Sequence, residues 1–311
     1  MKNLSELMES FLKQQEHSAR RSKETIRGYK AAFHLLLKFM PQMETSDITK
    51  ENLVDFFEFL QTRKRICGLN TEKSGVKTST IATYRSKLNA FFIWLVQDGL
   101  IKTNPFNGIE YPEVLYEDRK YLSKQDVEKI LTAIEVNCLD PLIRKRNKAI
   151  FSILLYCGLR RNEIVNLRFL DINLENKELK VRAETSKSKR NRLVPLHREV
   201  IYALKDYVEV RKSKNYKTEY LFVSHAADKP LTTHGLKHLV ESLKEKSGVQ
   251  FHLHRFRHTF AVNMLTRGCD SIKLQKLMGH KTMRMTLAYV RALPSTAMQE
   301  DIERLSIDKL L

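Results

Sequence analysis

Apolar residues recur at intervals of three and four along residues 4–95, the spacing that gathers side chains on one face of an α-helix. Four such stripes lie at residues 4–12, 26–40, 49–60 and 79–95. Their ends carry matching signals: Pro41 stops the second, Thr49 can cap the third and Gly99 ends the fourth. The pattern predicts a bundle of four or five helices with short connections, and a basic loop at residues 63–78.

The segment at residues 104–118 holds two prolines and several turn residues, which favours a linker. We therefore expect a helical domain at residues 1–110, a linker at 111–120 and a larger domain at 121–311. Most of the second domain has helical periodicity, and only Glu178–Arg182 and Arg192–Leu196 alternate as strands do. The predicted fold class is mainly α, with a small β-hairpin or sheet that makes the second domain α+β.

The charge of the chain points to a polyanionic partner. Its 311 residues include 55 Lys+Arg and 36 Asp+Glu, a formal net charge of +19. Residues 1–112 hold 17 bases and 12 acids, and residues 113–311 hold 38 and 24, so both halves are positive. Such a surplus favours phosphates, because binding releases their condensed counterions. Composition alone leaves nucleic acid and anionic lipid open, and two positive halves suit a grip on a polyanion between two lobes better than one lobe with a basic tail.

Other features exclude some classes of protein. No run of about 18 apolar residues occurs, so we expect no transmembrane span, and residues 1–6 have no apolar signal core. The four cysteines lie far apart without a CxxC pair, which predicts reduced thiols in a cytoplasmic protein and no zinc knuckle.

Four separated segments carry residues that can do chemistry: Gly158–Glu163, Thr185–Arg192, His252–Phe260 and Gly279–Tyr289. In the first, Arg160 and Glu163 are three residues apart, so on a helix the carboxylate can orient the guanidinium. In the third, the i, i+3, i+4 spacing of His254, Arg257 and His258 places all three on one helical face.

Together these residue types suit phosphoryl transfer. Two arginines can bind phosphate oxygens, histidines can donate hydrogen bonds, a lysine can protonate an alkoxide and a tyrosine can be the nucleophile. No carboxylate cluster of the kind that holds Mg²⁺ accompanies them, so we expect no cofactor. A zinc site at His252, His254 and His258 is an alternative, but no cysteine or carboxylate nearby completes it.

The four segments resemble the active-site boxes of the tyrosine recombinases, the phage integrase and Xer family. The run Gly158-Leu159-Arg160 resembles the first arginine box, and residues 254–261 are similar to the H-x-x-R-H-T-F-A box. Residues 277–280 followed by Tyr289 resemble the L-x-G-H…Y box, and residues 91–105 resemble part of the family's core-DNA-binding domain. Phe256 and Met278 stand where leucine is usual, and both are apolar. The likeness covers nearly the whole chain.

The resemblance implies roles for individual residues. The implied catalytic set is Arg160, Lys187, His254, Arg257, His280 and the nucleophile Tyr289, with Glu163 and His258 supporting it. Lys187 is placed by counting back from Val194-Pro195-Leu196, and Lys189 remains an alternative on the same turn. The implied reaction forms a 3′-phosphotyrosine link without metal or ATP, and exchanges strands through a Holliday junction.

The implied partner is duplex DNA, with two lobes around it and four protomers on two synapsed sites. Basic residues of the loop, the fourth helix and the hairpin tip are expected to contact DNA: Arg63, Lys64, Arg65, Lys77, Arg85, Lys189, Arg190 and Arg192. The segment at residues 297–311 has an apolar side that either closes its own core or docks on a neighbouring protomer. Two alternatives remain, a non-catalytic DNA-binding regulator and a type IB-like topoisomerase. The target site and the choice between an Xer-like and a mobile-element recombinase stay open.

Overall fold

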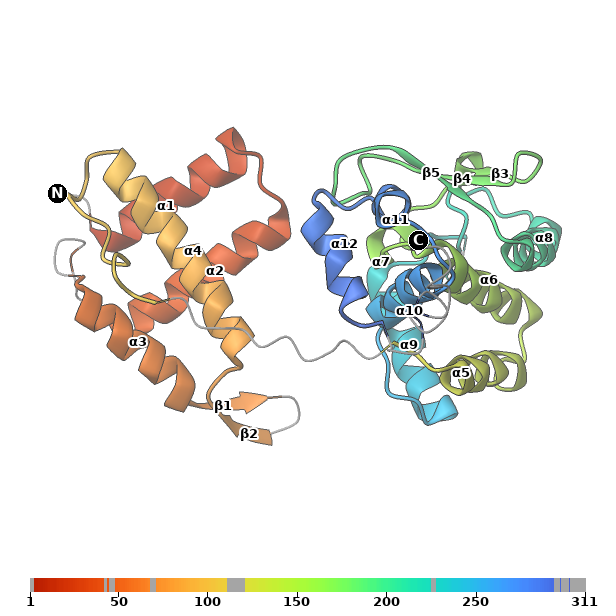
Figure 1. Ribbon diagram of the computed structural model, residues 1–311, viewed down its shortest axis with the longest axis horizontal. Coiled ribbons are helices and arrows are strands. Elements are labelled where there is room, and N and C mark those ends of the chain that lie inside the picture. The colour runs from red at the N-terminus through yellow and green to blue at the C-terminus, as the bar shows by residue number, and fades with distance from the viewer. Residues whose placement is uncertain are drawn as a thin grey trace, which may run out of the picture. The chain divides into compact units, whose positions relative to one another are not determined.

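The computed structural model describes residues 3–41, 44, 48–67, 71–110, 121–224, 228–293, 297 and 302. The chain divides into two compact units, residues 1–116 and 117–311 (Figure 1). The predicted linker at 111–120 and nearly all of the predicted C-terminal docking segment lie outside the described residues.

The first unit is a helical bundle with a small hairpin. Its elements are α1 (Leu4–Lys13), a short π-helix (Gln14–Ser18), α2 (Lys23–Phe39), α3 (Lys50–Thr62), β1 (Lys64–Cys67), β2 (Thr71–Ser74) and α4 (Thr78–Gln97). The four predicted stripes are confirmed as the buried faces of the four α-helices. Phe11, Phe33 and Phe91 from three of these helices meet with ring centroids 5.0–6.0 Å apart, which ties the bundle together.

The basic loop predicted after α3 is in fact a β-hairpin. β1 and β2 pair antiparallel, with Lys64 opposite Ser74 and Arg65 opposite Lys73. All four side chains of β2 are exposed, so no apolar alternation marks these strands in the sequence. The hairpin is held by its backbone ladder and by the Arg65 side chain, whose Nε donates to the Gly75 carbonyl at 2.7 Å.

The second unit is larger and mainly helical. Its elements are α5 (Lys124–Val136), α6 (Pro141–Cys157), α7 (Arg161–Val165), a 3₁₀ turn (Phe169–Asp171), β3 (Ile172–Asn173), β4 (Glu178–Val181), β5 (Arg192–Pro195), α8 (Arg198–Ser213), α9 (Thr233–Ser247), α10 (Leu253–Thr266), α11 (Ser271–Met278) and α12 (Met283–Val290). Helix α5 begins at a capping box formed by Ser123 and Asp126.

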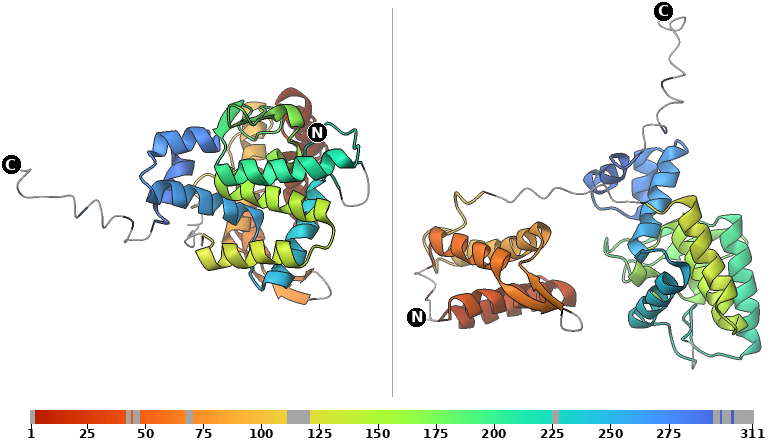
Figure 2. Two further views of the ribbon diagram at one scale, coloured as in Figure 1. Left: turned by 90° about the vertical axis from the view of Figure 1, so that its right-hand side faces the viewer. Right: turned by 90° about the horizontal axis from the view of Figure 1, so that it is seen from below.

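Helix α6 is the centre of this unit. It packs against α5, α8 and α10, and Figure 2 shows α5, α6 and α8 running side by side. The three strands form an antiparallel sheet in the order β3-β4-β5, with Leu179 opposite Val194. The predicted hairpin is therefore confirmed, and the two-residue strand β3 adds an edge that the sequence did not reveal. Residues of α6, α7 and β5 belong to one hydrophobic core. The junction between α6 and α7 is therefore held in place by the packing of this core.

Candidate active site

The first arginine box lies at the junction between α6 and α7. Gly158 ends α6 in the left-handed conformation at φ +60°, and a Cβ at this position would lie 2.4 Å from the ring of Phe260. Only glycine satisfies both conditions. The chain then turns sharply, so that Arg160 becomes the N-cap of α7 and Glu163 lies one turn into that helix. The turn therefore presents Arg160 where α6 and α7 meet.

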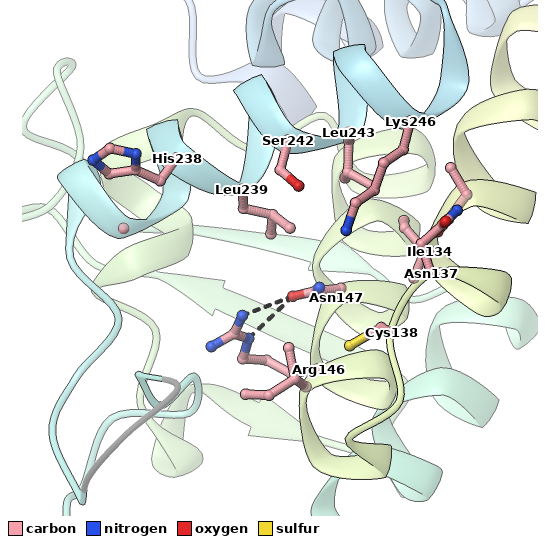
Figure 3. A pocket seen from close by; sticks show the side chains of 13 residues that line it. Ile134, Asn137, Cys138, Arg146, Asn147, His238, Leu239, Ser242, Leu243 and Lys246 are labelled. Atoms are coloured by element: carbon pink, nitrogen blue, oxygen red, sulfur yellow. Dashed lines mark hydrogen bonds between the residues drawn. The ribbon is translucent and has the colours of Figure 1, made fainter.

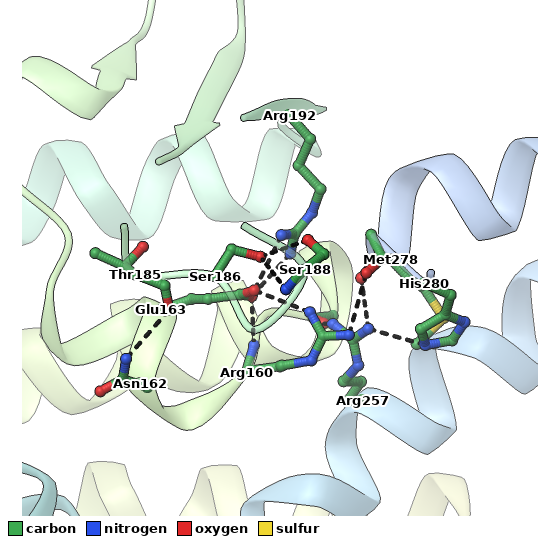
Figure 4. Close-up of polar contacts among 12 residues, drawn as sticks. Arg160, Asn162, Glu163, Thr185, Ser186, Ser188, Arg192, Arg257, Met278 and His280 are labelled. Atoms are coloured by element: carbon green, nitrogen blue, oxygen red, sulfur yellow. Dashed lines mark hydrogen bonds and ion pairs between the residues drawn. The ribbon is translucent and has the colours of Figure 1, made fainter. Parts of the chain in front are cut away.

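Glu163 is the hub of the polar contacts at this turn (Figure 4). Its Oε1 accepts from Nη1 of Arg160 and Nη1 of Arg192, both at 3.0 Å. Its Oε2 accepts from Nη2 of Arg192 and from the backbone N–H of Arg160, both at 2.8 Å. Burial raises the pKa of this carboxyl, but the bonds and charge of Arg192, followed by those of Arg160, outweigh it and lower the pKa to about 2. Glu163 is therefore a carboxylate throughout the physiological range.

Arg257 enters the same cluster from α10 and is 1% exposed. Its Nη1 donates to the Gly158 carbonyl at 2.5 Å, and its Nη2 donates to the Met278 carbonyl at 2.6 Å. Burial, together with the positive charge of Arg160, lowers its pKa to about 10, so the guanidinium remains charged at neutral pH. Nη2 of Arg160 reaches the next carbonyl, that of Gly279, at 3.3 Å. Two predicted arginines thus converge at the end of α11.

His280 follows directly on this turn, and its two ring nitrogens are both engaged. Nε2 lies 3.1 Å from Nη2 of Arg257, and Nδ1 lies 2.9 Å from the hydroxyl of Thr286. Burial, followed by the charges of Arg257 and Arg160, lowers the pKa of His280 to about 3, so the ring is neutral at pH 7. Because arginine only donates, Nε2 is the acceptor and Nδ1–H donates to Thr286. Nothing in the sequence marked the contribution of Thr286.

Tyr289 lies on α12 against two of the predicted histidines. Its ring is 5.7 Å from that of His280 in a stacked arrangement and 4.5 Å from that of His258 in an edge-on arrangement. The tyrosine is 3% exposed. His258 is also buried, whereas His254, one turn earlier on α10, is exposed and has its ring 6.2 Å from that of His258. The predicted third and fourth boxes are therefore in contact.

Lys187 lies on the turn between β4 and β5. The turn is attached to α7 by a hydrogen bond from Nδ2 of Asn162 to the Thr185 carbonyl at 3.1 Å. Ser186 and Ser188 are buried on either side of the exposed Lys187, and their hydroxyls are 2.8 Å apart. Lys189 is also exposed, in the left-handed conformation at φ +54°. Both candidate lysines therefore sit on a turn that is anchored beside Arg160.

Two family models match the chain in order. The phage integrase SAM-like domain matches residues 3–112, and the phage integrase family matches residues 120–295. A tyrosine recombinase of Thermosipho africanus is 30% identical over 92% of this chain and 95% of its own length. This chain belongs to the phage integrase family, the tyrosine recombinases. It is accordingly a site-specific recombinase, an enzyme that breaks and rejoins DNA.

Other relatives agree with this assignment. The tyrosine recombinase XerD of Listeria innocua is 27% identical over 86% of this chain and 88% of its own. The solved structure of the Tn1549 transposon integrase in complex with transposon right end DNA has a TM-score of 0.76 at 22% identity, covering 98% of this chain and 99% of that one. The XerH recombinase bound to palindromic difH substrate has a TM-score of 0.71 at 18% identity, covering 94% and 83%. These two structures show that the recombinase shares their fold.

Most of the basic residues predicted to contact DNA are at least partly exposed, in two groups. One group is Arg63, Lys64, Arg65 and Lys77 on and beside the β1–β2 hairpin, and the other is Lys189 and Arg190 on the β4–β5 turn. Lys64 also forms an ion pair with Glu72 across the hairpin at 3.3 Å.

The predictions for Arg85 and Arg192 are corrected by their burial. Arg85 is 6% exposed in α4, where it donates to the Ile109 carbonyl and lies over the ring of Phe106. Arg192 is 9% exposed and is bonded to Glu163. Each guanidinium thus binds groups inside its own unit, and neither is presented to a DNA surface.

A cavity of about 260 Å³ between α5, α6 and α9 is separate from these residues (Figure 3). Its wall includes Cys138, His238 and Lys246, and none of the predicted catalytic residues is among the described residues that line it. Arg146 at its base donates to its neighbour Asn147 and to the Val223 carbonyl, so it has a structural role.

Among the described residues, no group of three or more His, Cys, Asp or Glu side chains is arranged to hold a metal ion. None of the described helices has both the length and the apolar content needed to span a bilayer.

Proposed function

We propose that Tyr289 is the nucleophile of this recombinase. Its hydroxyl attacks the scissile phosphate, forms a 3′-phosphotyrosine link and frees a 5′-hydroxyl. The observation that carries the proposal is the convergence of Arg160, Arg257, His280 and Tyr289, which come from three distant segments, in one cluster. Packing alone does not explain two arginines and a tyrosine at one point, whereas phosphoryl transfer through a covalent tyrosine link can use all three.

The other residues of the predicted catalytic set bind the phosphate, orient its ligands or protonate the leaving group. Arg160 and Arg257 bind the non-bridging oxygens and offset the charge that develops on the phosphorane. His254, exposed on the first turn of α10, donates to the same phosphate. His280 accepts from Nη2 of Arg257 and fixes its direction. Lys187 protonates the departing 5′ oxygen.

Glu163 and His258 support this set without touching the phosphate. Glu163 holds Arg160 through both its backbone and its side chain, and His258 packs its ring against Tyr289. Because the phosphotyrosine link conserves the energy of the phosphodiester, rejoining requires neither ATP nor another cofactor.

We further propose that both units bind DNA. The first unit, as the core-DNA-binding domain at residues 1–110, presents the bases of the β1–β2 hairpin, and the catalytic domain at residues 121–311 presents Lys189 and Arg190. Support comes from the net positive charge of both halves and from the relatives solved with DNA, the Tn1549 integrase and XerH. Binding through phosphates in this way weakens steeply as salt is raised.

The requirements of strand exchange determine the number of protomers in the assembly that we propose. Two duplex sites with two cleavage positions each need four nucleophiles, so four protomers act in pairs through a Holliday junction. Residues 297–311, with their apolar side, are the proposed contact between neighbouring protomers. A chain that acts on DNA in this way is expected to work in the cytoplasm.

The decisive experiment uses a nicked suicide substrate built on the duplex sequence that the protein itself selects from a random library. This substrate traps the covalent intermediate because the cleaved fragment diffuses away. Tyr289→Phe is expected to keep its affinity for the site and to give no covalent adduct. The matched control is Tyr202→Phe, the same change at a tyrosine that is 62% exposed on α8, and it is expected to give the wild-type yield. An adduct formed by Tyr289→Phe would refute the assignment. Failure of the wild type to form an adduct would favour a non-catalytic DNA-binding protein.

A further inference from the structure

Three successive carbonyl groups at the C-terminal end of α11 each accept a hydrogen bond from a different arginine. The Leu277 carbonyl accepts from Nε of Arg192 at 2.8 Å, and the carbonyls of residues 278 and 279 accept from Arg257 and Arg160. The last carbonyls of a helix have no partner within it and carry the negative end of its dipole. The end of α11 is therefore a natural anchor for guanidinium groups. The proposed function gives roles to Arg160 and Arg257 and none to Arg192.

Arg192 joins three elements that the chain brings from different places. It is the first residue of β5, it pairs through both Nη atoms with Glu163 on α7, and its Nε reaches α11. The side chain is 6% exposed. Packing at the α11 end is close, because a Cβ on Gly279 would lie 3.2 Å from Cδ and Nη1 of Arg192. Its position is thus fixed by charge, by three hydrogen bonds and by contact.

Arg192 and Arg160 both bond to the Glu163 carboxylate, and this shared partner explains how Arg192 affects the position of Arg160. Each oxygen of Glu163 accepts one bond from Arg192 and one from Arg160, so the carboxylate is satisfied while taking a single bond from the Arg160 guanidinium. Without Arg192, this buried carboxylate would pair with Arg160 alone. Attraction between opposite charges is strong where water is excluded, so the Arg160 guanidinium would be drawn towards Glu163 and away from a bound phosphate.

We propose that Arg192 is a positioning residue that aims Arg160 and Arg257 at the phosphate. It neutralises Glu163, and by binding the Leu277 carbonyl it fixes the end of α11 to which both arginines are attached. This inference rests on the proposed function, which makes those two arginines the phosphate ligands. It also gives Arg192, at the start of β5, a role separate from that of Lys187 on the turn between β4 and β5.

The test compares Arg192→Lys with Arg198→Lys. Both substitutions keep the positive charge, but lysine cannot make a bidentate contact with Glu163 and a third bond to Leu277 at once. Arg198, at the start of α8, has a side chain that is 79% exposed and no proposed role at the site, so it serves as the matched control. Each variant is mixed in excess with two suicide substrates, one with the normal 5′ oxygen and one with sulfur at that bridging position. The rate constant and the final yield of adduct are measured separately, along with the affinity for DNA.

The sulfur substrate separates the two halves of the site, because a thiolate leaves without a proton. Lys187→Ala is expected to cleave the oxygen substrate slowly and the sulfur substrate at nearly the wild-type rate. Arg192→Lys is expected to be slower on both substrates by the same factor, on the order of 100-fold, since it misplaces groups that bind the phosphate. Its affinity for DNA and its final yield should match those of Arg198→Lys, which cleaves at the wild-type rate.

Several outcomes would overturn the inference. An unchanged rate constant with a lower yield would mean that Arg192 only maintains the fold. Rescue of Arg192→Lys by the sulfur substrate would mean that Arg192 acts on Lys187. A loss of affinity with no loss of rate at saturation would make it a DNA contact. If the wild type forms no adduct on either substrate, it is the proposed function that fails.

Discussion

Glu163 should make the stability of the second unit depend on pH, and the substitution Glu163→Gln tests this. Its pKa is about 2 in the folded protein against a usual value of 4.5. A carboxyl whose pKa is lowered by folding stabilises the fold above its unfolded pKa, and this contribution is lost as the pH falls towards the folded value. The shift corresponds to about 3 kcal/mol at pH 7, of which about 2 kcal/mol is lost by pH 3.

The perturbation is Glu163→Gln, which keeps the shape and removes the charge. At pH 7 it leaves the buried Arg192 without its counter-ion, and loss of one partner from such a pair costs about 3–5 kcal/mol. At pH 3 the carboxyl is protonated in the unfolded wild type and still largely ionised in the folded one, so folding competes with proton binding and part of the stabilisation is lost. The difference in unfolding free energy between wild type and variant should therefore narrow by about 2 kcal/mol between pH 7 and pH 3.

Urea titrations followed by far-UV circular dichroism measure this difference at each pH. The single tryptophan, Trp94, lies in the first unit, so its fluorescence reports that unit alone and should show the same midpoint in both proteins. Glu128→Gln is the control, because that carboxyl is 60% exposed in its ion pair with Lys124 and such pairs contribute little. A difference for Glu163→Gln that stays constant from pH 7 to pH 3 would refute the reasoning.

Three further predictions concern the chemistry and the turn that supports it. Lys187→Ala should slow cleavage of ordinary DNA much more than Lys189→Ala, and the opposite order in single-turnover assays would move the general acid to Lys189. Cleavage by the wild type should proceed in EDTA, since the proposed mechanism uses the positive charges of Arg160, Arg257 and Lys187 in place of a metal ion. Strict dependence on a divalent ion would contradict this. Gly158→Ala and Gly248→Ala both place alanine at a left-handed helix end, at a cost of about 1–2 kcal/mol each. Only the first meets a neighbour, the Phe260 ring, so its loss of stability in thermal unfolding should be larger by about 1–3 kcal/mol, and equal losses would show that the ring yields freely.

Most of the fold could be predicted because its helices carry local signals. The apolar stripes marked α1 to α4, and the N-cap at Thr49 marked the start of α3. The β1–β2 hairpin could not be found in this way, because its strands are short and exposed and its stability comes from backbone pairing rather than from burial. Strand β3 has only two residues, too few for any periodicity.

The candidate site was predictable where its residues are close in the sequence and not where they are distant. Arg160 and Glu163 are three residues apart, so their contact followed from helix geometry. The bond from Arg257 to the Gly158 carbonyl spans 99 residues and depends on how α10 packs on α6. No spacing rule within one element contains that information.

The predictions that Arg85 and Arg192 contact DNA failed for a different reason. In each case the sequence held a local signal of burial. Residues two apart on a strand share a face, and in β5 Arg192 alternates with Leu193, which is 56% exposed, and so lies on the face of the buried Val194. Arg85 likewise lies four residues after Ile81 on the buried stripe of α4. An arginine at a core-facing position must find acceptors within the fold, because an unpaired buried charge is too costly. Counting it among the bases of the surface overlooks this requirement. Periodicity thus tells which arginines hold the structure together before any coordinates are known, and for Arg192 the acceptor that satisfies this requirement is the Glu163 carboxylate that also holds Arg160.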